Sequence, residues 1–142
     1  MAEPNGVVVS GGVEGFTQEI TAGRHHLVAD EPVDVGGSDR GPGPYELLLA
    51  ALGSCMSMTI ALYARRKAIP LRRVVIQLSH SRDYENDCEN CMTEDRRLDR
   101  VRIRLELSGD FSTEQRAKLV EIAHKCPVHR TLSAGIKIQI EA

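Results

Sequence analysis

The longest uncharged stretch of the chain covers residues 47–64. Leucine, alanine, methionine and isoleucine recur in it at every phase of a helical period, whereas a surface helix keeps its apolar residues on one face. Pro44 can occupy the first turn of a helix, where its missing N–H needs no partner. The pattern predicts one long helix that begins near Pro44 and ends around Arg65–Lys67, before Pro70 prevents continuation.

A helix that is apolar on every side must be buried on every side. A membrane-spanning helix needs about 20 predominantly apolar residues. This stretch falls slightly short of that length and contains several small or polar residues, so we predict a core helix in a protein interior. Because a chain of 142 residues has difficulty enclosing one helix by itself, a second copy of the chain is expected to cover part of it. The pattern thus predicts a homodimer whose core continues across the interface.

Alternation of apolar and polar side chains predicts β-strands on both sides of this helix. Before it, strands are expected at Val7–Val9, Gly15–Thr21 and Arg24–Ala29, the last two joined by a tight turn at Ala22 and Gly23. Residues 30–44 are dense in Gly, Pro and Asp and are predicted to form a loop. After the helix, strands are expected at Leu71–Arg82, Leu98–Leu107 and Ile136–Glu141.

Two shorter helices are predicted between the last two strands. Ser112 followed by Gln115 is the signature of a capping box, and apolar residues then recur at helical spacing as far as Cys126. Pro127 disfavours helical geometry at Cys126 and starts a second short helix, which runs to about Ser133. Three strands, a long helix, two strands, helices and a final strand make an α+β fold with a largely antiparallel sheet.

The composition is that of a soluble globular protein with one domain, residues 1–142, since 42% of the residues are hydrophobic and 27% are charged. A net charge of -2 argues against nucleic acid or an anionic membrane as a partner and favours a small-molecule substrate. No secretion signal or lipidation motif is found at the start of the chain, so we expect a cytoplasmic protein. In a reducing cytosol the four cysteines are not expected to form structural disulfides.

Cys55 is the strongest candidate for chemistry and lies in the middle of the predicted central helix. It is about three turns from the helix start, where the positive end of the helix has little influence. A buried cysteine in apolar surroundings is normally inert, so a nearby cation would be needed to stabilise its thiolate. Arg24 in the predicted hairpin could supply a guanidinium if the hairpin folds over the helix, although a surface arginine on a strand is the ordinary alternative.

Cys126 occupies an apolar-face position at the break before Pro127, which is also compatible with a plain core residue. It could form a disulfide with Cys55 only if the two Cα atoms come within about 7 Å. His129 flanks these candidate residues, as do His25 and His26 near Arg24. A histidine at the end of a strand or helix is more often satisfied locally than catalytic.

Cys88 and Cys91 form a CxxC pair in an acidic segment between two predicted strands. Structural zinc usually takes four ligands, so two more would be needed, with His80 the nearest in sequence and a second chain another source. Asp87 and Glu89 oppose thiolate formation, which weakens a redox role. We expect exposed thiols or a secondary redox pair ahead of zinc, and we predict no metal or other cofactor.

Three segments of the chain form a combined pattern: GPGPYELLLAALGSCMSMTI, KCPVHRTLSAGIKI and AGRHHLVADEP. The pattern consists of two cysteines, the residues that flank them and the number of residues between them. With the order of elements between them, these segments resemble the OsmC/Ohr family of thiol-dependent hydroperoxide reductases over nearly the whole chain. The resemblance implies an intertwined homodimer with two active sites at the interface. It further implies that Cys55 is the peroxidatic cysteine, Cys126 the resolving cysteine, and Arg24 the residue that lowers the thiol pKa and orients the peroxide.

The mechanism implied by this resemblance begins with attack of Cys55 on the O–O bond of an organic hydroperoxide. The resulting sulfenic acid condenses with Cys126 to a disulfide, which an external dithiol reduces. The enzyme alternative is a thiol/disulfide reductase that uses the same cysteines. The alternative of a different class is a non-catalytic dimeric protein that binds a small apolar or thiol ligand.

One position departs from the peroxidase members of that family, in which a glutamate directly follows the helix-starting proline and holds the arginine. Here that position is Tyr45, and Glu46 comes one place later, on the opposite face of the helix from Cys55. Tyr45, Glu46 and His129 are therefore named as candidates for the substrate pocket, with Glu46 a poor substitute for the family's glutamate.

Overall fold

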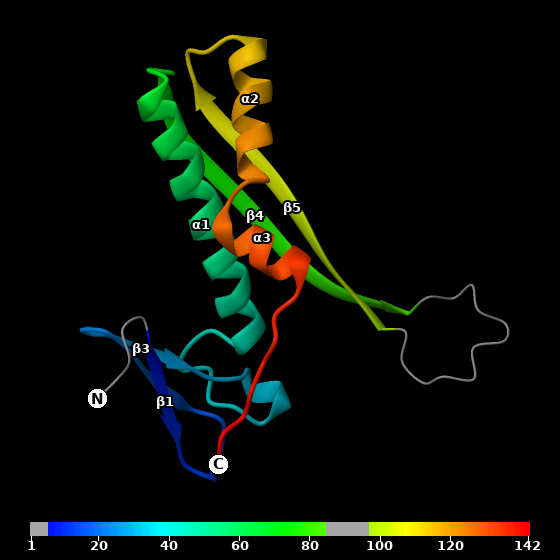
Figure 1. The fold of residues 1–142 in the computed structure, drawn as a ribbon. Helices are drawn as coiled ribbons and strands as arrows, with labels where there is room; N and C mark the ends of the chain where they lie inside the picture. The colour runs from blue at the N-terminus through cyan, green and yellow to red at the C-terminus, as the bar shows by residue number, and fades with distance from the viewer. Residues whose placement is uncertain (1–5, 85–96) are drawn as a thin grey trace, which may run out of the picture. The chain divides into compact units, whose positions relative to one another are not determined.

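The computed structural model of the chain describes residues 6–84 and 97–142 (Figure 1). The chain divides into two compact units, Met1–Leu48 and Leu49–Ala142, and the boundary falls within the long helix. Strands and helices are both present in the chain, so the predicted α+β class is confirmed.

The first unit contains a three-stranded antiparallel sheet in the order β1-β2-β3. Its strands are β1 (Val7–Gly11), β2 (Gln18–Ala22) and β3 (His25–Ala29). The strand predicted from Gly15 begins later, and Gly15 itself has a positive φ of 70° that is incompatible with a regular strand. Ala22 pairs with His25, so the turn consists of Gly23 and Arg24, one residue later than predicted. Gly23 has a φ of 61°, which a glycine adopts without steric cost.

The loop between this sheet and the long helix is organised by Asp30, whose side chain is buried. Burial alone would raise the pKa of this carboxyl, but hydrogen bonds to its oxygens outweigh burial and lower the pKa. The predicted loop is therefore held by one acidic side chain. The donors are the backbone N–H of Glu31 at 2.8 Å, the Thr17 hydroxyl at 3.0 Å, the N–H of Arg40 at 3.2 Å and the N–H of Ser38 at 3.4 Å.

The long helix α1 (Pro44–Arg66) has the bounds that the sequence predicts and follows a 3-10 turn, η1 (Val33–Val35). Glu46 Oε1 accepts a hydrogen bond of 3.0 Å from the N–H of Gly43, which satisfies a donor at the helix start. At the other end the N–H of Ile69 donates to the carbonyl of Ala64 at 2.9 Å. Ala68 between them has a φ of 52°, the left-handed conformation that terminates many helices.

The second unit contains a long two-stranded antiparallel ribbon, formed by β4 (Leu71–Tyr84) and β5 (Arg97–Gly109). Two helices follow it, α2 (Thr113–Ala123) and α3 (Pro127–Ala134), and the predicted capping box of Ser112 and Gln115 is present (Figure 1). The core forms where α1 and α2 meet the apolar face of the ribbon. Its buried residues are Leu52, Met56, Ile60, Ala64, Leu119, Ala123 and Cys126, with Val74, Ile76, Leu78, Ile103, Leu105 and Leu107 of the ribbon packed against them.

One face of α1 is not covered within the described part of the chain. Leu48, Met58 and Leu62 are 41%, 70% and 44% exposed, whereas Leu52, Met56 and Ile60 on the adjoining side of the helix are buried. By length and composition α1 could cross a membrane, but core helices of soluble proteins pass the same test. Its buried residues belong to the hydrophobic core, which is the environment predicted for this helix.

The predicted strand Ile136–Glu141 is wrong, because the chain has no regular structure after Gly135. Ile136, Ile138 and Ile140 alternate as expected for a strand, yet they are 57%, 80% and 88% exposed. A strand exists only when its backbone pairs with a neighbouring strand, and none of the described strands pairs with this segment. Alternation predicts which side chains of a strand share a face. It does not show whether a neighbouring strand is available for the backbone to pair with.

We predict that Asp30→Ala lowers the melting temperature measured by circular dichroism, because three backbone N–H groups and the Thr17 hydroxyl lose their acceptor. Asp34→Ala, which removes an exposed aspartate from the same loop, is the control and should change little. Since folding lowers the pKa of Asp30, its stabilisation is present above the unfolded pKa of about 3.9 and disappears as the pH falls through the folded pKa. A difference between wild type and Asp30→Ala that grows on acidification would contradict this account.

Candidate active site

The candidate site lies at the first turn of α3. Cys126 precedes this helix as its N-cap residue, with the extended backbone angles (φ -61°, ψ 135°) that a residue before proline favours. The side chain of Cys126 is completely buried, and its Sγ accepts a hydrogen bond of 3.3 Å from the N–H of His129. The predicted break at Pro127 is thus present, and it places a buried sulfur against the unpaired N–H groups of a helix start.

Cys55 reaches the same helix start from the middle of α1. The Cys126 side chain and the backbone N–H of Val128 both act on the pKa of its thiol, so its sulfur lies close to them. Both cysteines are free thiols, Cys55 partly buried and Cys126 buried. Two thiols that are far apart in the sequence are therefore in contact within the second unit.

The two thiols differ in acidity. Burial alone would raise the pKa of Cys55, but the N–H of Val128 and the Cys126 side chain outweigh burial and lower the pKa. The nearby Thr59 hydroxyl donates to the backbone carbonyl of Cys55 at 2.7 Å. Burial raises the pKa of Cys126, and its hydrogen bond to Cys55 raises that pKa further. The pair therefore favours a thiolate at Cys55 and a protonated thiol at Cys126.

Sequence reasoning missed Val128, whose N–H acts on both sulfurs. From the sequence, only a cation was expected to offset the burial of Cys55, because the start of its own helix is about three turns away. The structure supplies the start of a different helix instead. The available signal was Pro127, which marks a helix start and therefore unpaired N–H groups on the residues that follow.

Arg24, Tyr45 and Glu46 all belong to the first unit. Arg24 is exposed in the turn between β2 and β3, and Tyr45 is exposed in the first turn of α1. The carboxylate of Glu46 is engaged by the N–H of Gly43 at the start of its own helix. Because each unit is held together by its own contacts, an approach of Arg24 or Tyr45 to Cys55 stays a prediction.

His129, whose backbone N–H donates to Cys126, lines a cavity of about 260 Å³ that neither Cys55 nor Cys126 lines. Leu52, one helical turn before Cys55, lies on another wall of this cavity. The Nδ1 atom of His129 lies 3.4 Å from the hydroxyl oxygen of Ser133. The remaining lining residues are mainly apolar and come from β5 and α3: Asp99, Val101, Ile103, Leu132 and Ser133.

Cys88 and Cys91 lie outside the described residues, so the secondary thiol pair and the zinc site both stay predictions. His80, the nearest histidine in the sequence, has its Nε2 atom 2.8 Å from Asp99 Oδ1. Within residues 6–84 and 97–142 no group of three or more His, Cys, Asp or Glu side chains could hold a metal ion.

Several solved structures have the same fold at low sequence identity. The OsmC-like protein of Mycoplasma pneumoniae is 19% identical with a TM-score of 0.72, over 94% of this chain and 89% of that chain. The organic hydroperoxide resistance protein OsmC of Legionella pneumophila is 23% identical with a TM-score of 0.62, over 87% and 85% of the two chains. An organic hydroperoxide resistance protein of Elizabethkingia anophelis is 17% identical with a TM-score of 0.65, over 92% and 88%.

A search of the curated proteins finds no match to this chain. The family model described as OsmC-like protein matches residues 36–141, a segment that includes α1 with Cys55 and the start of α3 with Cys126. This match covers more than half of the chain, and the fold agrees with it. The resemblance found in the sequence is thereby confirmed, and the chain belongs to the family of OsmC-like proteins.

Proposed function

We propose that this protein is a cysteine-based peroxidase that reduces organic hydroperoxides with a dithiol as reductant. The proposal depends on one observation, the contact between two thiols of unequal acidity, Cys55 and Cys126. Membership of the OsmC-like family supports it. Two of the structural neighbours are organic hydroperoxide resistance proteins, and their names point to the same substrate class.

Cys55 is the attacking group in this proposal, because the thiolate is the nucleophilic form of cysteine and its pKa is lowered. The sulfur attacks the hydroxyl oxygen of the hydroperoxide and forms an S–O bond while the O–O bond breaks. The other oxygen leaves as an alkoxide and takes a proton to become the alcohol. Sulfur is oxidised to a sulfenic acid and the peroxide is reduced, so no metal or other cofactor is needed.

Cys126 resolves the sulfenic acid. Its sulfur forms a bond to the sulfur of Cys55 and displaces the hydroxyl group, which leaves as water with the proton of the Cys126 thiol. The N–H of His129 lowers the pKa of Cys126 in part and stabilises negative charge as that proton leaves. An external dithiol then reduces the disulfide to two thiols and becomes a disulfide itself.

The cavity lined by His129 and Leu52, which are near Cys126 and Cys55 in the sequence, favours a hydroperoxide with an apolar substituent over hydrogen peroxide. Leu52, Ile103 and Leu132 form apolar walls, which gain from burying an alkyl or aryl group. His129 lines the same cavity and is a polar residue among these apolar walls. Arg24 is proposed to orient the peroxide from the hairpin of the first unit, and Tyr45 to line the pocket.

We also propose that the protein acts as a homodimer in the cytoplasm, with the site closed by the partner subunit. Leu48, Cys55 and Leu62 are spaced seven residues apart and therefore share one side of α1. That side is exposed at Leu48 and Leu62 and only partly covered at Cys55. A partner that covers this apolar side would also exclude water from the reactive sulfur.

We predict that the reduced protein consumes cumene hydroperoxide catalytically with dithiothreitol as reductant. The rate is measured as the disappearance of the peroxide. Cys55→Ser should lower the rate by a factor on the order of 10³ or more, because the nucleophile is lost. In the absence of dithiothreitol, Cys126→Ser should reduce one equivalent of peroxide and stop at the sulfenic acid, which mass spectrometry detects as one added oxygen.

The matched control is one double variant, Cys88→Ser combined with Cys91→Ser, which removes both thiols of the CxxC pair. It should retain most of the wild-type rate. If the wild type consumed peroxide as slowly as both single variants, the peroxidase function would be excluded. The non-catalytic binding function would then be favoured. Reduction of a small disulfide with no turnover of peroxide would favour the thiol/disulfide reductase.

The acidity of Cys55 is tested by its rate of alkylation with iodoacetamide at a series of pH values, with the labelled peptide identified by mass spectrometry. The midpoint should lie below the pH of about 8.5 expected for an unperturbed cysteine. Cys126→Ala removes a hydrogen-bond donor and should raise the midpoint, whereas Cys126→Ser keeps a donor and should raise it less. The peroxidase rate should rise with pH through the same midpoint. An unchanged midpoint in Cys126→Ala would refute the proposed origin of the acidity.

The homodimer is tested by analytical ultracentrifugation of the wild type and of Met58→Glu. The substitution places a charge in the exposed apolar face of α1 and should weaken dimerisation by at least about tenfold, since a buried unpaired charge is costly. Gln77→Glu, at an exposed position on the ribbon, adds the same charge and should leave the dimer intact. A wild type that sediments as a monomer at micromolar concentration would rule out this arrangement.

A further inference from the structure

Thr59 lies about one helical turn after Cys55 on α1, and its hydroxyl donates a hydrogen bond of 2.7 Å to the Cys55 carbonyl. We propose that the oxygen of this hydroxyl accepts a hydrogen bond from the O–H of a hydroperoxide at Cys55, and then from the O–H of the sulfenic acid that forms. This role for Thr59 rests on the proposed function, and it adds a residue that contacts the substrate at the reacting atoms.

The helix itself places the Thr59 hydroxyl beside Cys55. Side chains of an α-helix lean toward its N-terminus, so the side chain of Thr59 lies over the turn that carries Cys55. A helical threonine can fix its side chain by donating to the carbonyl four residues earlier, which is the bond found here. Thr59 also acts on the pKa of the Cys55 thiol, so its hydroxyl lies close to the sulfur. Both side chains are only partly buried within the chain, which leaves the space beside them open to a small molecule.

The direction of this hydrogen bond decides what the hydroxyl can do next. A threonine hydroxyl has one hydrogen to donate and two lone pairs that accept. Because the hydrogen of Thr59 is directed at the Cys55 carbonyl, lone pairs remain for a molecule at the sulfur. The other groups that act on the Cys55 thiol are the N–H of Val128, which is a donor, and the Cys126 side chain, whose sulfur accepts weakly. Among these groups Thr59 therefore supplies the oxygen acceptor.

The hydroperoxide presents an O–H that needs such an acceptor. Its O–H hydrogen is on the oxygen that the thiolate attacks, so a hydrogen bond to Thr59 holds that oxygen beside the sulfur. As the S–O bond forms and the O–O bond breaks, the hydrogen stays on the transferred oxygen, and the other oxygen leaves as the alkoxide. The sulfenic acid therefore carries the same O–H to the same acceptor. This hydrogen bond favours the neutral sulfenic acid over the sulfenate anion, which a second peroxide oxidises more readily.

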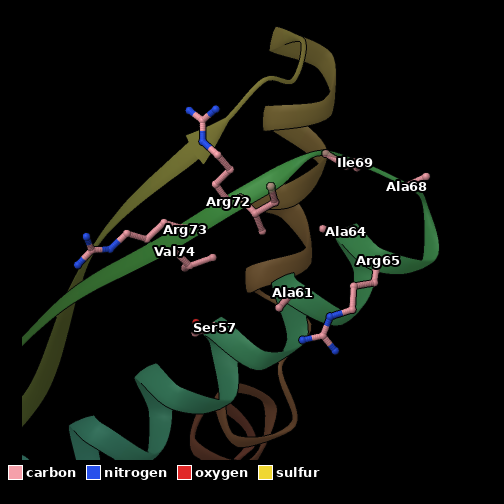
Figure 2. Close-up of a pocket in the computed structure, with 10 residues that line it drawn as sticks. Ser57, Ala61, Ala64, Arg65, Ala68, Ile69, Arg72, Arg73 and Val74 are labelled. Carbon is pink, nitrogen blue, oxygen red and sulfur yellow. The ribbon is translucent and has the colours of Figure 1, made fainter.

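Ser57 provides a matched control on the same stretch of α1. It is two residues from both Cys55 and Thr59, which is a rotation of about 200° around the helix axis. Ser57 lines a different cleft, of about 340 Å³, between the C-terminal end of α1 and the start of β4 (Figure 2). Removal of the Ser57 hydroxyl therefore changes α1 on the side away from the Cys55 sulfur.

The test compares two reagents that attack the same thiolate, with rates measured above the alkylation midpoint of each variant. Cumene hydroperoxide carries an O–H on the attacked oxygen, whereas iodoacetamide has none on the attacked carbon. Thr59→Val, which replaces the hydroxyl with a methyl group, should lower the rate constant for oxidation of Cys55 about five- to tenfold. Its rate of alkylation should change by less than about twofold, because the thiolate itself is intact. Thr59→Ser and Ser57→Ala should keep both rates near those of the wild type.

The contact with the sulfenic acid has its own readout in the Cys126→Ser background, with a large excess of cumene hydroperoxide and no dithiol. Addition of Thr59→Val should speed formation of the sulfinic acid about threefold or more, which mass spectrometry detects as a second added oxygen. An unchanged rate would overturn the contact with the sulfenic acid.

The contact with the hydroperoxide is overturned if Thr59→Val is oxidised as fast as the wild type, if alkylation slows as much as oxidation, or if Ser57→Ala has the same effect. In each of these cases the wild type still reacts with peroxide far faster than Cys55→Ser, and the proposed function stands. A wild type that does not react with peroxide refutes the proposed function and the role of Thr59 together.

Discussion

The candidate site depends on the unpaired backbone N–H groups at the start of α3. The first N–H groups of any helix have no acceptor within the helix. In α3 the N–H of His129 donates to the sulfur of Cys126, and the N–H of Val128 acts on both sulfurs. Pro127 makes this possible because it needs no partner for itself and presets the helical φ. Two sulfurs in a mainly apolar environment therefore receive donors from the backbone.

This arrangement requires close packing of α1 against its neighbours. A Cβ atom on Gly53 would lie 2.7 Å from Leu78 Cδ1, so only glycine leaves room for Leu78 in its present position. Gly53 lies within the helical turn that carries Cys55, and it brings that turn close to β4. Cys126 is part of the same core cluster as Leu52 and Met56, so the packing that buries α1 also holds the two thiols in contact.

The helices could be predicted from the sequence because their signals are local. Pro44 starts α1, the Ser112–Gln115 box starts α2, and Gly135 ends α3, each through chemistry within a few residues. The contact between Cys55 and Cys126 could not be derived in this way, since it depends on how α3 packs against α1. The C-terminal strand fails for a related reason. Ile136, Ile138 and Ile140 have the right alternation, but pairing needs an edge that the described strands of this chain do not provide.

The origin of the acidity of Cys55 also bears on the departure at Tyr45. In the peroxidases that the chain resembles, a glutamate holds the arginine that acts on the thiol, and here Glu46 is engaged by the N–H of Gly43 instead. A thiolate stabilised by the N–H of Val128 does not require an ordered arginine. An arginine brought into the site would act mainly on the peroxide, whose oxygens need a donor as the O–O bond breaks.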